Sequence, residues 1–460
     1  MNHNQNWASV VNVLGYGYSG SSAVVDLLQE VEGYTAFPTE FNLIRAADGL
    51  IDLEQQLIAS WSPIRSMHAI TRFRQLAIKL NRPQREILGD YCGYSEAFSD
   101  AFLDLSQAYI DSLIQISRDT EVWHFGDYEN SPGHDDALHM ELYFSAPSQA
   151  YFLECTREYL NQLMQVLLSR ERSQSVILDQ GLEIANLAHS SRYLPANRTI
   201  VVDRDPRDIL ADTQQRKIRW IPHDNVDEFI LYSRILRQRS VDHELSDGKT
   251  LRIRLEDLVF DYEATKDVIF AFLDIDPSQH REKKLTLFDP SRSVANIGLW
   301  KNSLDQDVMA RVADAGIEDV RASKRPVVYA AMCADILHHG HLNIIRESAK
   351  LGCLTVGLLT DEAIESYKTG PVMSFDERKS VVQGVRGVED VIAQESLDYR
   401  PNLRRLKPDF VVHGDDWQIG VQQETRQQVL QVLSEWEGEL VELPYTEGVS
   451  STKFRSRLGS

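Results

Sequence analysis

The chain has 460 residues, of which 43% are hydrophobic and 9% are aromatic, and its formal net charge is −21. This length and apolar content predict roughly two or three folded domains with their own cores. The acidic balance would repel a phosphodiester backbone, which argues against a nucleic-acid polymer as a partner. Small anions can still bind where a loop or a few cations favour them locally.

Cysteine usage and apolar runs argue against several other classes of protein. The four cysteines form no C-x-x-C pair, so neither a disulfide scaffold nor a zinc knuckle is indicated. No basic segment with a long apolar core opens the chain, and no run of about 18 uncharged apolar residues follows. We therefore expect a soluble, cytoplasmic protein without a membrane span, and we assign no metal ligands.

The N-terminal part opens with a strand, a glycine loop and a helix. Residues 10–14 are apolar and predict a strand, 15–21 form a turn rich in glycine and serine, and 22–30 predict a helix. Apolar residues recur at helical spacing over roughly 97–118 and 149–170, where we expect long helices.

Two further segments of this part combine a strand with a helix. Residues 198–215 (RTIVVDRDPRDILADTQQ) predict a buried strand, a charged turn and a helix. Residues 251–275 predict a short strand, an acidic turn and an amphipathic helix. The first part of the chain is therefore expected to be an α/β domain.

The polar stretch at 316–326 (GIEDVRASKRP) interrupts the apolar pattern and is the predicted domain boundary. It separates a domain over 1–318 from one over 326–460, with a linker at 319–325. Beyond it, strands alternate with helices: PVVYAA, LTVGLLT, DFVVHG and ELVELPY predict strands, and HLNIIRESAKLG, SFDERKSVVQGV and ETRQQVLQVLSEW predict helices. This alternation predicts a parallel sheet with right-handed crossovers.

Three histidines lie within ILHHGHLN (336–343), between the first strand of the second domain and the helix after it. Open parallel sheets bind ligands at this place, beside a helix N-terminus. Two imidazoles there suit charge that develops on a phosphate group, and Gly340 allows a close backbone approach. The residues alone leave two alternatives open, packed structural histidines and a metal site built on His338 and His341.

The motif H-x-G-H (His338, Gly340, His341) is the signature of a nucleotidyltransferase superfamily. More of the segment resembles the cytidylyltransferases that act on glycerol phosphate, phosphocholine and phosphoethanolamine. YTEGVSSTKFR (445–455) is similar to their T-E-G-I-S-[ST]-T signature, and HGDDW (413–417) to their G-x-D-W segment. Over about 326–458 the chain most resembles the cytidylyltransferase domains that accompany phosphoenolpyruvate mutase in phosphonate pathways.

This resemblance implies a Rossmann-like domain that transfers CMP from CTP to a small phosphonate, such as 2-aminoethylphosphonate, or to a phosphoalcohol, with Mg²⁺ and release of pyrophosphate. His338 and His341 would stabilise the pentacovalent state, and Lys368 and Arg378 would neutralise phosphate charge unless they are solvated surface cations. The implied CTP-binding residues are Ala331, Met332, Asp335, Gly340, Asp415, Asp416, Trp417, Gly448, Ser450, Ser451 and Thr452.

Two departures from the pattern leave the acceptor open. Met332-Cys333-Ala334 replaces the usual G-T-F, and Tyr445 replaces an arginine. A cytidylyltransferase for glycerol phosphate or phosphocholine, and an adenylyltransferase, are therefore kept as alternatives.

The N-terminal loop GYGYSGSS lacks the lysine of a Walker A loop, which argues against an ATPase or kinase of that type. With the later segments, residues 9–305 resemble the sulfotransferase superfamily, whose [KR]-S-G-[ST]-[ST] loop holds the phosphosulfate of 3′-phosphoadenosine-5′-phosphosulfate (PAPS). VVDRDPRDILAD is similar to its 3′-phosphate segment, and NIGLWKN (296–302) to its late G-x-W loop. The resemblance implies a P-loop-like α/β fold.

The sulfotransferase resemblance also implies specific residues. The PAPS-binding set is Tyr18, Ser19, Gly20, Ser21, Ser22, Arg204 and Thr213. FPTEF (37–41) is similar to a P-x-E-F stretch whose glutamate can act as general base, which makes Glu40 the candidate.

Two departures bear on sulfuryl transfer. Tyr18 stands in the usual cation position, and Asp212 stands where a serine is expected, unless Thr213 substitutes for it. A non-catalytic nucleotide-binding or scaffolding module is therefore the alternative for this domain. A glycan or lipid acceptor and a homodimer stay open.

Overall fold

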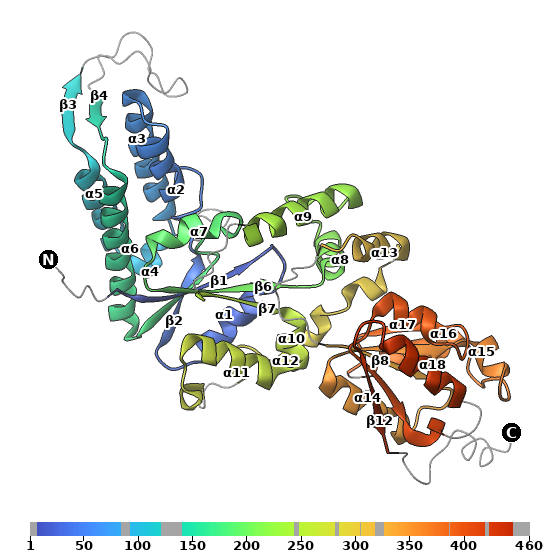
Figure 1. Ribbon diagram of the computed structural model, residues 1–460. Coiled ribbons are helices and arrows are strands. Elements are labelled where there is room, and N and C mark those ends of the chain that lie inside the picture. Colours follow the sequence, from blue (N-terminus) through green and yellow to red (C-terminus); the bar gives the residue numbers. More distant parts are fainter. Residues whose placement is uncertain are drawn as a thin grey trace. The chain divides into compact units, whose positions relative to one another are not determined.

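The chain divides into two compact units, Met1–Ser323 and Lys324–Ser460, each described here by itself. The structure is a computed structural model (Figure 1), and it describes residues 7–83, 93–120, 140–242, 248–280, 285–303, 305–317, 326–385, 387–418 and 423–444. The expected linker at 319–325 lies outside the described residues.

The first unit is built on a five-stranded parallel sheet in the order β2-β5-β1-β6-β7. Its strands are β1 (Ser9–Gly15), β2 (Tyr34–Glu40), β5 (Ser175–Asp179), β6 (Asn197–Asp203) and β7 (Thr250–Arg254). The central strand β1 carries valine or leucine on both faces, with the buried Asn12 between them, because both faces of a parallel sheet are covered.

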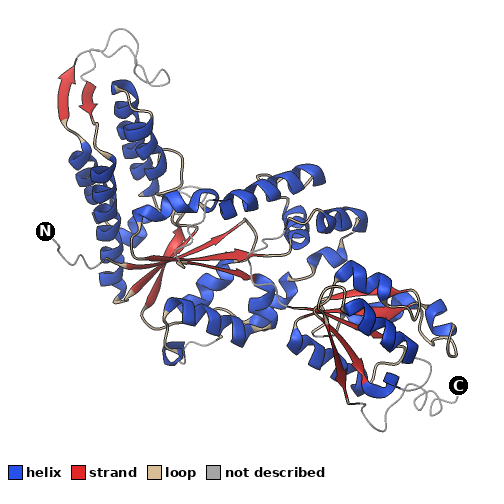
Figure 2. Ribbon diagram, in the orientation of Figure 1, coloured by secondary structure: helices blue, strands red, loops and turns tan. Residues whose placement is uncertain are grey.

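Alternation along β1 divides the unit's interior into two cores. Val10 and Leu14 pack in one hydrophobic cluster, whereas Val11 and Val13 pack in the other. Helices cover both faces of the sheet (Figure 2). The helices of this unit outside the excursion between β2 and β5 include α1 (Ser21–Gln29), α6 (Gln149–Glu171), α8 (Pro206–Arg216), α9 (Val226–Asp242), α10 (Leu255–Phe260), α11 (Tyr262–Leu273), α12 (Pro290–Ser293) and α13 (Gln306–Asp314). Of these, α8, α9 and α13 form a separate hydrophobic cluster with one another.

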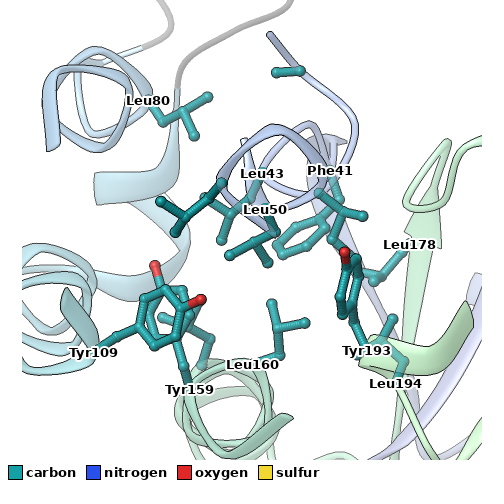
Figure 3. Close-up of a cluster of buried hydrophobic side chains, with 14 of the residues drawn as sticks. Phe41, Leu43, Leu50, Leu80, Tyr109, Tyr159, Leu160, Leu178, Tyr193 and Leu194 are labelled. Atoms are coloured by element: carbon teal, nitrogen blue, oxygen red, sulfur yellow. The ribbon is translucent and has the colours of Figure 1, made fainter. Parts of the chain in front are cut away.

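A helical excursion between β2 and β5 enlarges the first core. It contains α2 (Leu50–Glu54), the π-helix Gln55–Ala59, α3 (Pro63–Leu80), α4 (Tyr94–Phe98) and α5 (Ala101–Leu113). Figure 3 shows side chains from this excursion, such as Leu50 and Tyr109, packing toward Leu160 of α6 and Leu178 of β5. The excursion therefore shares one core with the sheet.

Two predictions for this unit were wrong in part. The helix expected over 97–118 ends at Leu113, because Ile116–Thr120 (β3) pairs antiparallel with Met140–Phe144 (β4). The acidic turn expected within 251–275 is the short helix α10, in which Leu255 and Leu258 are buried. In both places tertiary contacts decide the local structure.

The second unit has a five-stranded parallel sheet in the order β10-β9-β8-β11-β12. Its strands are β8 (Val327–Met332), β9 (Cys353–Leu359), β10 (Asp390–Gln394), β11 (Phe410–Gly414) and β12 (Glu439–Leu443). Its helices are α14 (His339–Leu351), α15 (Asp361–Glu365), α16 (Phe375–Gln383), α17 (Arg400–Leu406) and α18 (Gln423–Leu433). The predicted α/β fold class with parallel sheets in two domains is confirmed.

The strand order of the second sheet fixes where a ligand can bind. Counted within the unit, the order is third, second, first, fourth, fifth, so the chain reverses direction across the sheet between β8 and β11. Ligands of doubly wound sheets bind at the carboxyl ends of the strands beside this point. In the described part of the chain, the helices are too short or too polar to span a bilayer.

Candidate functional sites

The loop between β1 and α1 turns sharply because three of its residues have positive φ. Gly17, Tyr18 and Gly20 have φ of 80°, 55° and 87°. Gly20 is the N-cap of α1, and no side chain caps that helix. The first amides of α1 therefore face the loop without a side-chain acceptor, which is the arrangement that binds anions.

The loop serines divide into two groups. Ser19 is buried and its hydroxyl accepts a hydrogen bond from the Tyr16 amide at 3.1 Å, so it shapes the loop. Ser22 is exposed and, with Gly20, lines a cavity of about 390 Å³. Of the predicted PAPS-binding serines, Ser22 is thus the one that faces the cavity from the helix N-terminus.

Arg204 follows β6 and lines the same cavity. Its side chain is 3% exposed, and its guanidinium donates to the Tyr18 carbonyl at 2.8 Å, to the Asn296 carbonyl and to Asp212 at 3.0 Å. The Nε–H of Arg204 is buried and has no hydrogen-bond partner among the residues that the structure describes. Arg204 therefore connects the glycine loop to the segment around Asn296 at the cavity wall.

Asp212 does not stand as an isolated anion beside the cavity. One oxygen accepts from Arg204 and the other accepts from Nε of Arg216 at 2.5 Å. Arg216 lies over the Tyr18 ring, 5.9 Å from its centroid, and also lines the cavity. The two arginines thus neutralise the charge of Asp212. Arg216 also places a positive charge beside Tyr18, the residue that stands where the sequence pattern has a lysine or arginine.

Thr213 lies in the core instead of the cavity wall. Its side chain is fully buried and its hydroxyl donates to the carbonyls of Ile209 and Leu210 within α8. A direct phosphate contact by Thr213 would require those bonds to break. Beside Arg204, the cavity wall is formed by Asp212 and Arg216 instead of Thr213.

The G-x-W segment is fixed by α8, a feature that the sequence pattern did not indicate. The Asp208 carboxylate accepts from the amides of Gly298 (2.7 Å) and Trp300 (3.1 Å). Arg207 pairs with Asp205 and lies 3.8 Å from the centroid of the Trp300 ring. Asn296, the first residue of this segment, lines the cavity together with Asp289, Arg292 and Ser293, which the sequence analysis missed.

Glu40, the predicted base, ends β2 and forms an ion pair with Arg45. Its register partner on the neighbouring strand is Asp179, the last residue of β5. Burial and the nearby charge of Glu40 raise the pKa of Asp179 to about 6. Two carboxylates therefore meet at the edge of the sheet that carries the glycine loop.

In the second unit, the histidines form a reciprocal cap at the start of α14. Nδ1 of His338, the N-cap residue, accepts from the Gly340 amide at 3.2 Å, and Nδ1 of His341 accepts from the His338 amide at 3.4 Å. Their ring centroids are 4.0 Å apart. Because a nitrogen that accepts carries no proton, each neutral ring holds its proton on Nε2.

Both histidines are neutral near pH 7. Burial lowers the pKa of His341 to about 4, with smaller contributions from the neighbouring His338, when it is protonated, and from Lys368. Burial and His339 lower the pKa of His338 below its usual value. Lys368 is exposed and close enough to act on His341 electrostatically. The site therefore offers Nε2–H donors and a separate cation.

Arg378 is fully buried and its donors are taken up by the protein. Its guanidinium donates to the carbonyls of Cys333 (2.7 Å), Leu359 (2.8 Å) and Met373 (3.2 Å) and to Asp361 (2.6 Å). Cys333 begins the histidine loop and Leu359 ends β9. This geometry supports a positioning role for Arg378 instead of the expected direct contact with phosphate.

Asp335 likewise stabilises the loop geometry. It is 2% exposed and its carboxylate accepts from the amides of Val372 (2.7 Å) and Met373 (3.1 Å). Asp335 and Arg378 thus both hold the segment at Val372 and Met373, the first through its amides and the second through the Met373 carbonyl.

The remaining predicted CTP residues lie at the same edge of the sheet or outside the described residues. Ala331 and Met332 end β8, and the turn at Asp415–Gln418 follows β11. Trp417 is buried, stacks on His413 at 3.9 Å and donates to Glu442 at 2.7 Å, so it supports this turn from within. Outside the described residues lie Gly448, Ser450, Ser451 and Thr452; the side chain of Asp416 is likewise undescribed.

Residues 330–457 match the family described as cytidylyltransferase-like. The second unit contains a cytidylyltransferase-like domain. Ethanolamine-phosphate cytidylyltransferases of Dictyostelium discoideum and Mus musculus are 33% and 34% identical to it over 145 and 134 residues, which cover 30% and 28% of this chain. The bifunctional protein HldE of Streptomyces coelicolor is 33% identical over 141 residues, or 30% of this chain. The chain spans 38%, 32% and 29% of the lengths of these three relatives.

Similarity to solved structures extends to the first unit. The sulfotransferase domain of the Synechococcus PCC 7002 olefin synthase is 15% identical and covers 69% of this chain and 98% of its own, with a TM-score of 0.34. A lipopolysaccharide core biosynthesis protein of Thermoplasma volcanium is 24% identical and covers 26% of this chain and 98% of its own, with a TM-score of 0.24. The function proposed for the first unit therefore rests on its own residues and their geometry.

Proposed function

We propose that the second unit transfers CMP from CTP to a small phosphonate or phosphoalcohol and releases pyrophosphate. The observation that carries this proposal is the pair of imidazoles at the N-terminus of α14, where the sheet reverses direction. Because both Nδ1 atoms accept from backbone amides, each neutral ring has its proton on Nε2. The family match over 330–457 supports the same reaction class.

The reaction requires that the acceptor and CTP be held in line and that the negative charge developing on the α-phosphate be stabilised. The acceptor's phosphoryl oxygen, already an anion, attacks the α-phosphorus of CTP in line, so the chain need not supply a base. His338 and His341 donate from Nε2 to the α-phosphate oxygens as negative charge develops there. Lys368 stabilises the phosphates as a charge, and Arg378 and Asp335 hold the surrounding loops.

Mg²⁺ would screen the charge of the departing pyrophosphate. It commonly binds through substrate phosphates with one or two carboxylates. Asp415, one of the residues expected to bind CTP, begins the turn after β11 at the carboxyl edge of the sheet, where its carboxylate would lie on the side of the bound triphosphate.

Two of the relatives are named for ethanolamine phosphate, which supports a small amino-phosphoryl acceptor. In 2-aminoethylphosphonate two carbons separate the amine from phosphorus. In phosphoethanolamine the same two carbons separate the amine from the ester oxygen of the phosphate. The phosphonate acceptor is our proposal, based on the motifs of the sequence.

A pyrophosphate-release assay on the full chain tests this function. CTP with 2-aminoethylphosphonate or phosphoethanolamine should release pyrophosphate, and ATP should be a poor substitute. Turnover with phosphocholine or glycerol phosphate alone would place the chain with the lipid-precursor enzymes. Preference for ATP would make it an adenylyltransferase, and no release with any pair would refute the proposal.

We further propose that the first unit is a PAPS-dependent sulfotransferase, so that the chain is bifunctional with its boundary at 319–325. The uncapped N-terminus of α1, the cavity beside it and the arginines Arg204 and Arg216 support binding of a 3′,5′-bisphosphate nucleotide. Isothermal titration with adenosine 3′,5′-bisphosphate tests this proposal. Absence of heat at millimolar ligand would refute it, and binding without sulfuryl transfer would identify a nucleotide-binding module.

A further inference from the structure

The carboxyl ends of β2, β5 and β1 bring together groups that the sequence patterns did not connect. These three strands are neighbours in the sheet, and β5 lies between the other two. The register pairs Glu40 of β2 with Asp179 of β5, and β1 leads directly into the glycine loop. Asp179 therefore stands on the strand between Glu40 and the loop.

Hydrogen bonds connect Asp179 with the first turn of α1. The Ser21 hydroxyl donates to Oδ1 of Asp179 at 3.3 Å. Gln180 donates from Nε2 to the Ser21 hydroxyl at 3.1 Å and accepts from the Gly15 amide at 3.4 Å. The carboxylate of Asp179 is thus fixed relative to the helix N-terminus that would hold the sulfuryl donor.

The backbone at this corner is strained. Gln180 has φ of 52°, in the left-handed region that non-glycine residues rarely adopt. Such strain persists where surrounding contacts enforce it, and it concentrates at functional sites. The chain turns at Gln180, immediately after Asp179, and the two side-chain hydrogen bonds of Gln180 hold it in this conformation.

Glu40 differs from Asp179 in its partners. Its carboxylate pairs with Arg45, five residues later in the chain. Among the residues that the structure describes, the side chains that hydrogen-bond the Asp179 carboxylate are Ser21 and Gln180, and neither carries a charge. A carboxylate held by hydroxyl and amide groups can take up a proton at lower cost than one that would have to break an ion pair.

We propose that Asp179, rather than Glu40, is the catalytic base of the first unit, and that Glu40 with Arg45 positions it. This inference rests on the proposed sulfotransferase function. The acceptor hydroxyl gives its proton to the Asp179 carboxylate while its oxygen forms a bond to the sulfur of PAPS. The bond from sulfur to the bridging phosphate oxygen breaks, and adenosine 3′,5′-bisphosphate leaves with that electron pair.

The charges that face Asp179 agree with this role. Glu40 acts from β2 to raise the pKa of Asp179, and Arg45 acts from the segment after β2 to lower it. Burial makes the largest contribution, and Ser21 and Gln180 add hydrogen bonds that lower the pKa. With a pKa of about 6, the carboxylate is ionised near neutrality and remains basic enough to accept a proton.

The test compares Asp179→Asn and Glu40→Gln in the full chain, with exposed Asp104→Asn as the matched control. The probe is PAPS with water, followed as release of inorganic sulfate, and PAPS with 4-nitrophenolate, an acceptor that is already ionised. We expect Asp179→Asn to lower sulfate release by about 10²–10⁴-fold, the usual contribution of a general base, with a much smaller loss for the phenolate. Asp179→Asn should bind adenosine 3′,5′-bisphosphate as tightly as wild type. The control Asp104→Asn should release sulfate at the wild-type rate.

Glu40→Gln separates the two carboxylates. Without the charge of Glu40, the rate at high pH should fall far less than in Asp179→Asn, and its pH midpoint should move to lower pH. Loss of the rate in Glu40→Gln with retention in Asp179→Asn would assign the base to Glu40, and equal losses with both acceptors would give Asp179 a structural role. Wild type that binds the bisphosphate but reacts with neither acceptor overturns the inference, whereas wild type that does not bind it overturns the proposed function itself.

Discussion

The corners β1–α1 and β8–α14 both join a central parallel strand to a helix, yet they prepare an anion site in different ways. At β1–α1 the N-cap is Gly20, no side chain caps the helix, and the cations come from distant positions such as Arg204. At β8–α14 the cap is made by His338 and His341. The first corner therefore offers fixed backbone amides, and the second adds side-chain donors.

This difference suggests a division between binding and catalysis. Backbone amides and buried arginines hold a phosphate equally well before and during a reaction, so they contribute mainly to affinity. Neutral imidazoles gain most when charge increases on the oxygen they face, so they contribute mainly to the rate. The variants below test whether the two corners follow this division.

The largest expected effect is on the scaffold of the second corner. Arg378→Ala should lower the free energy of unfolding of the second unit by about 3–5 kcal/mol, because it leaves Asp361 unpaired and the carbonyls of Cys333 and Leu359 without donors. Urea unfolding would measure it, with the exposed Arg346→Ala as control. A stability loss no greater than that of the control would mean that Arg378 does not hold these loops.

His341→Ala should act on the rate of cytidylyl transfer. Loss of one donor to a developing oxyanion typically costs about 10²–10³ in kcat, or about 2.7–4 kcal/mol. Steady-state kinetics with a CTP titration would show the loss in kcat and little change in CTP affinity. His339→Ala, its exposed neighbour, is the control. A kcat equal to that of wild type would remove His341 from the mechanism.

Arg204→Ala should act on affinity at the first corner. Loss of a hydrogen bond to a charged group weakens binding by about 1.5–3 kcal/mol, which calorimetry with adenosine 3′,5′-bisphosphate would measure. Exposed Arg234→Ala serves as control, and a thermal melt of each variant would separate binding from unfolding. Unchanged affinity in a folded Arg204→Ala protein would place the nucleotide elsewhere.

The smallest expected effect is on stability: the contributions of Asp179 and His341 to the free energy of unfolding should change with pH in opposite directions. The pKa of Asp179 is raised to about 6, so its stabilising contribution is complete below its usual 3.8 and is lost as pH rises through 6. The pKa of His341 is lowered from 6.5 to about 4, so its contribution is complete above 6.5 and is lost as pH falls toward 4.

Urea unfolding of wild type, Asp179→Asn and His341→Ala at about pH 5 and about pH 7 would measure these contributions. Relative to its variant, Asp179 should stabilise more at the lower pH and His341 more at the higher pH. The same sign for both residues would contradict the pKa shifts.

Most of the strands and the longer helices of the second unit could be predicted from apolar spacing, whereas the short helices α15 and α17 were not. The runs at β8, β9, β11 and β12 fall where the sequence placed strands. Strand β10 was missed because its five residues, DVIAQ, are too short and mixed to stand out. The predicted helix over 97–118 ran into the first residues of β3, because the partner strand β4 lies about twenty residues away in sequence.

The candidate sites were predictable in their motifs but not in their partners. His338, His341 and Arg204 stand out as residue types at fixed spacing. The burial of Arg378 against carbonyls 19 and 45 residues away depends on how strands and loops converge. Asp179 gave no sequence signal at all, because its significance comes from the register of β5 against β2 and from burial.

The most direct test of the account is the protonation state of His341, observed by nitrogen-15 NMR of the histidine rings in the full chain. Comparison of wild type with His341→Ala assigns the ring signal. The account predicts a proton on Nε2 at neutral pH and a titration midpoint near 4. A proton on Nδ1, or a midpoint at or above the usual 6.5, would show that the second corner does not present the neutral donor on which its proposed chemistry depends.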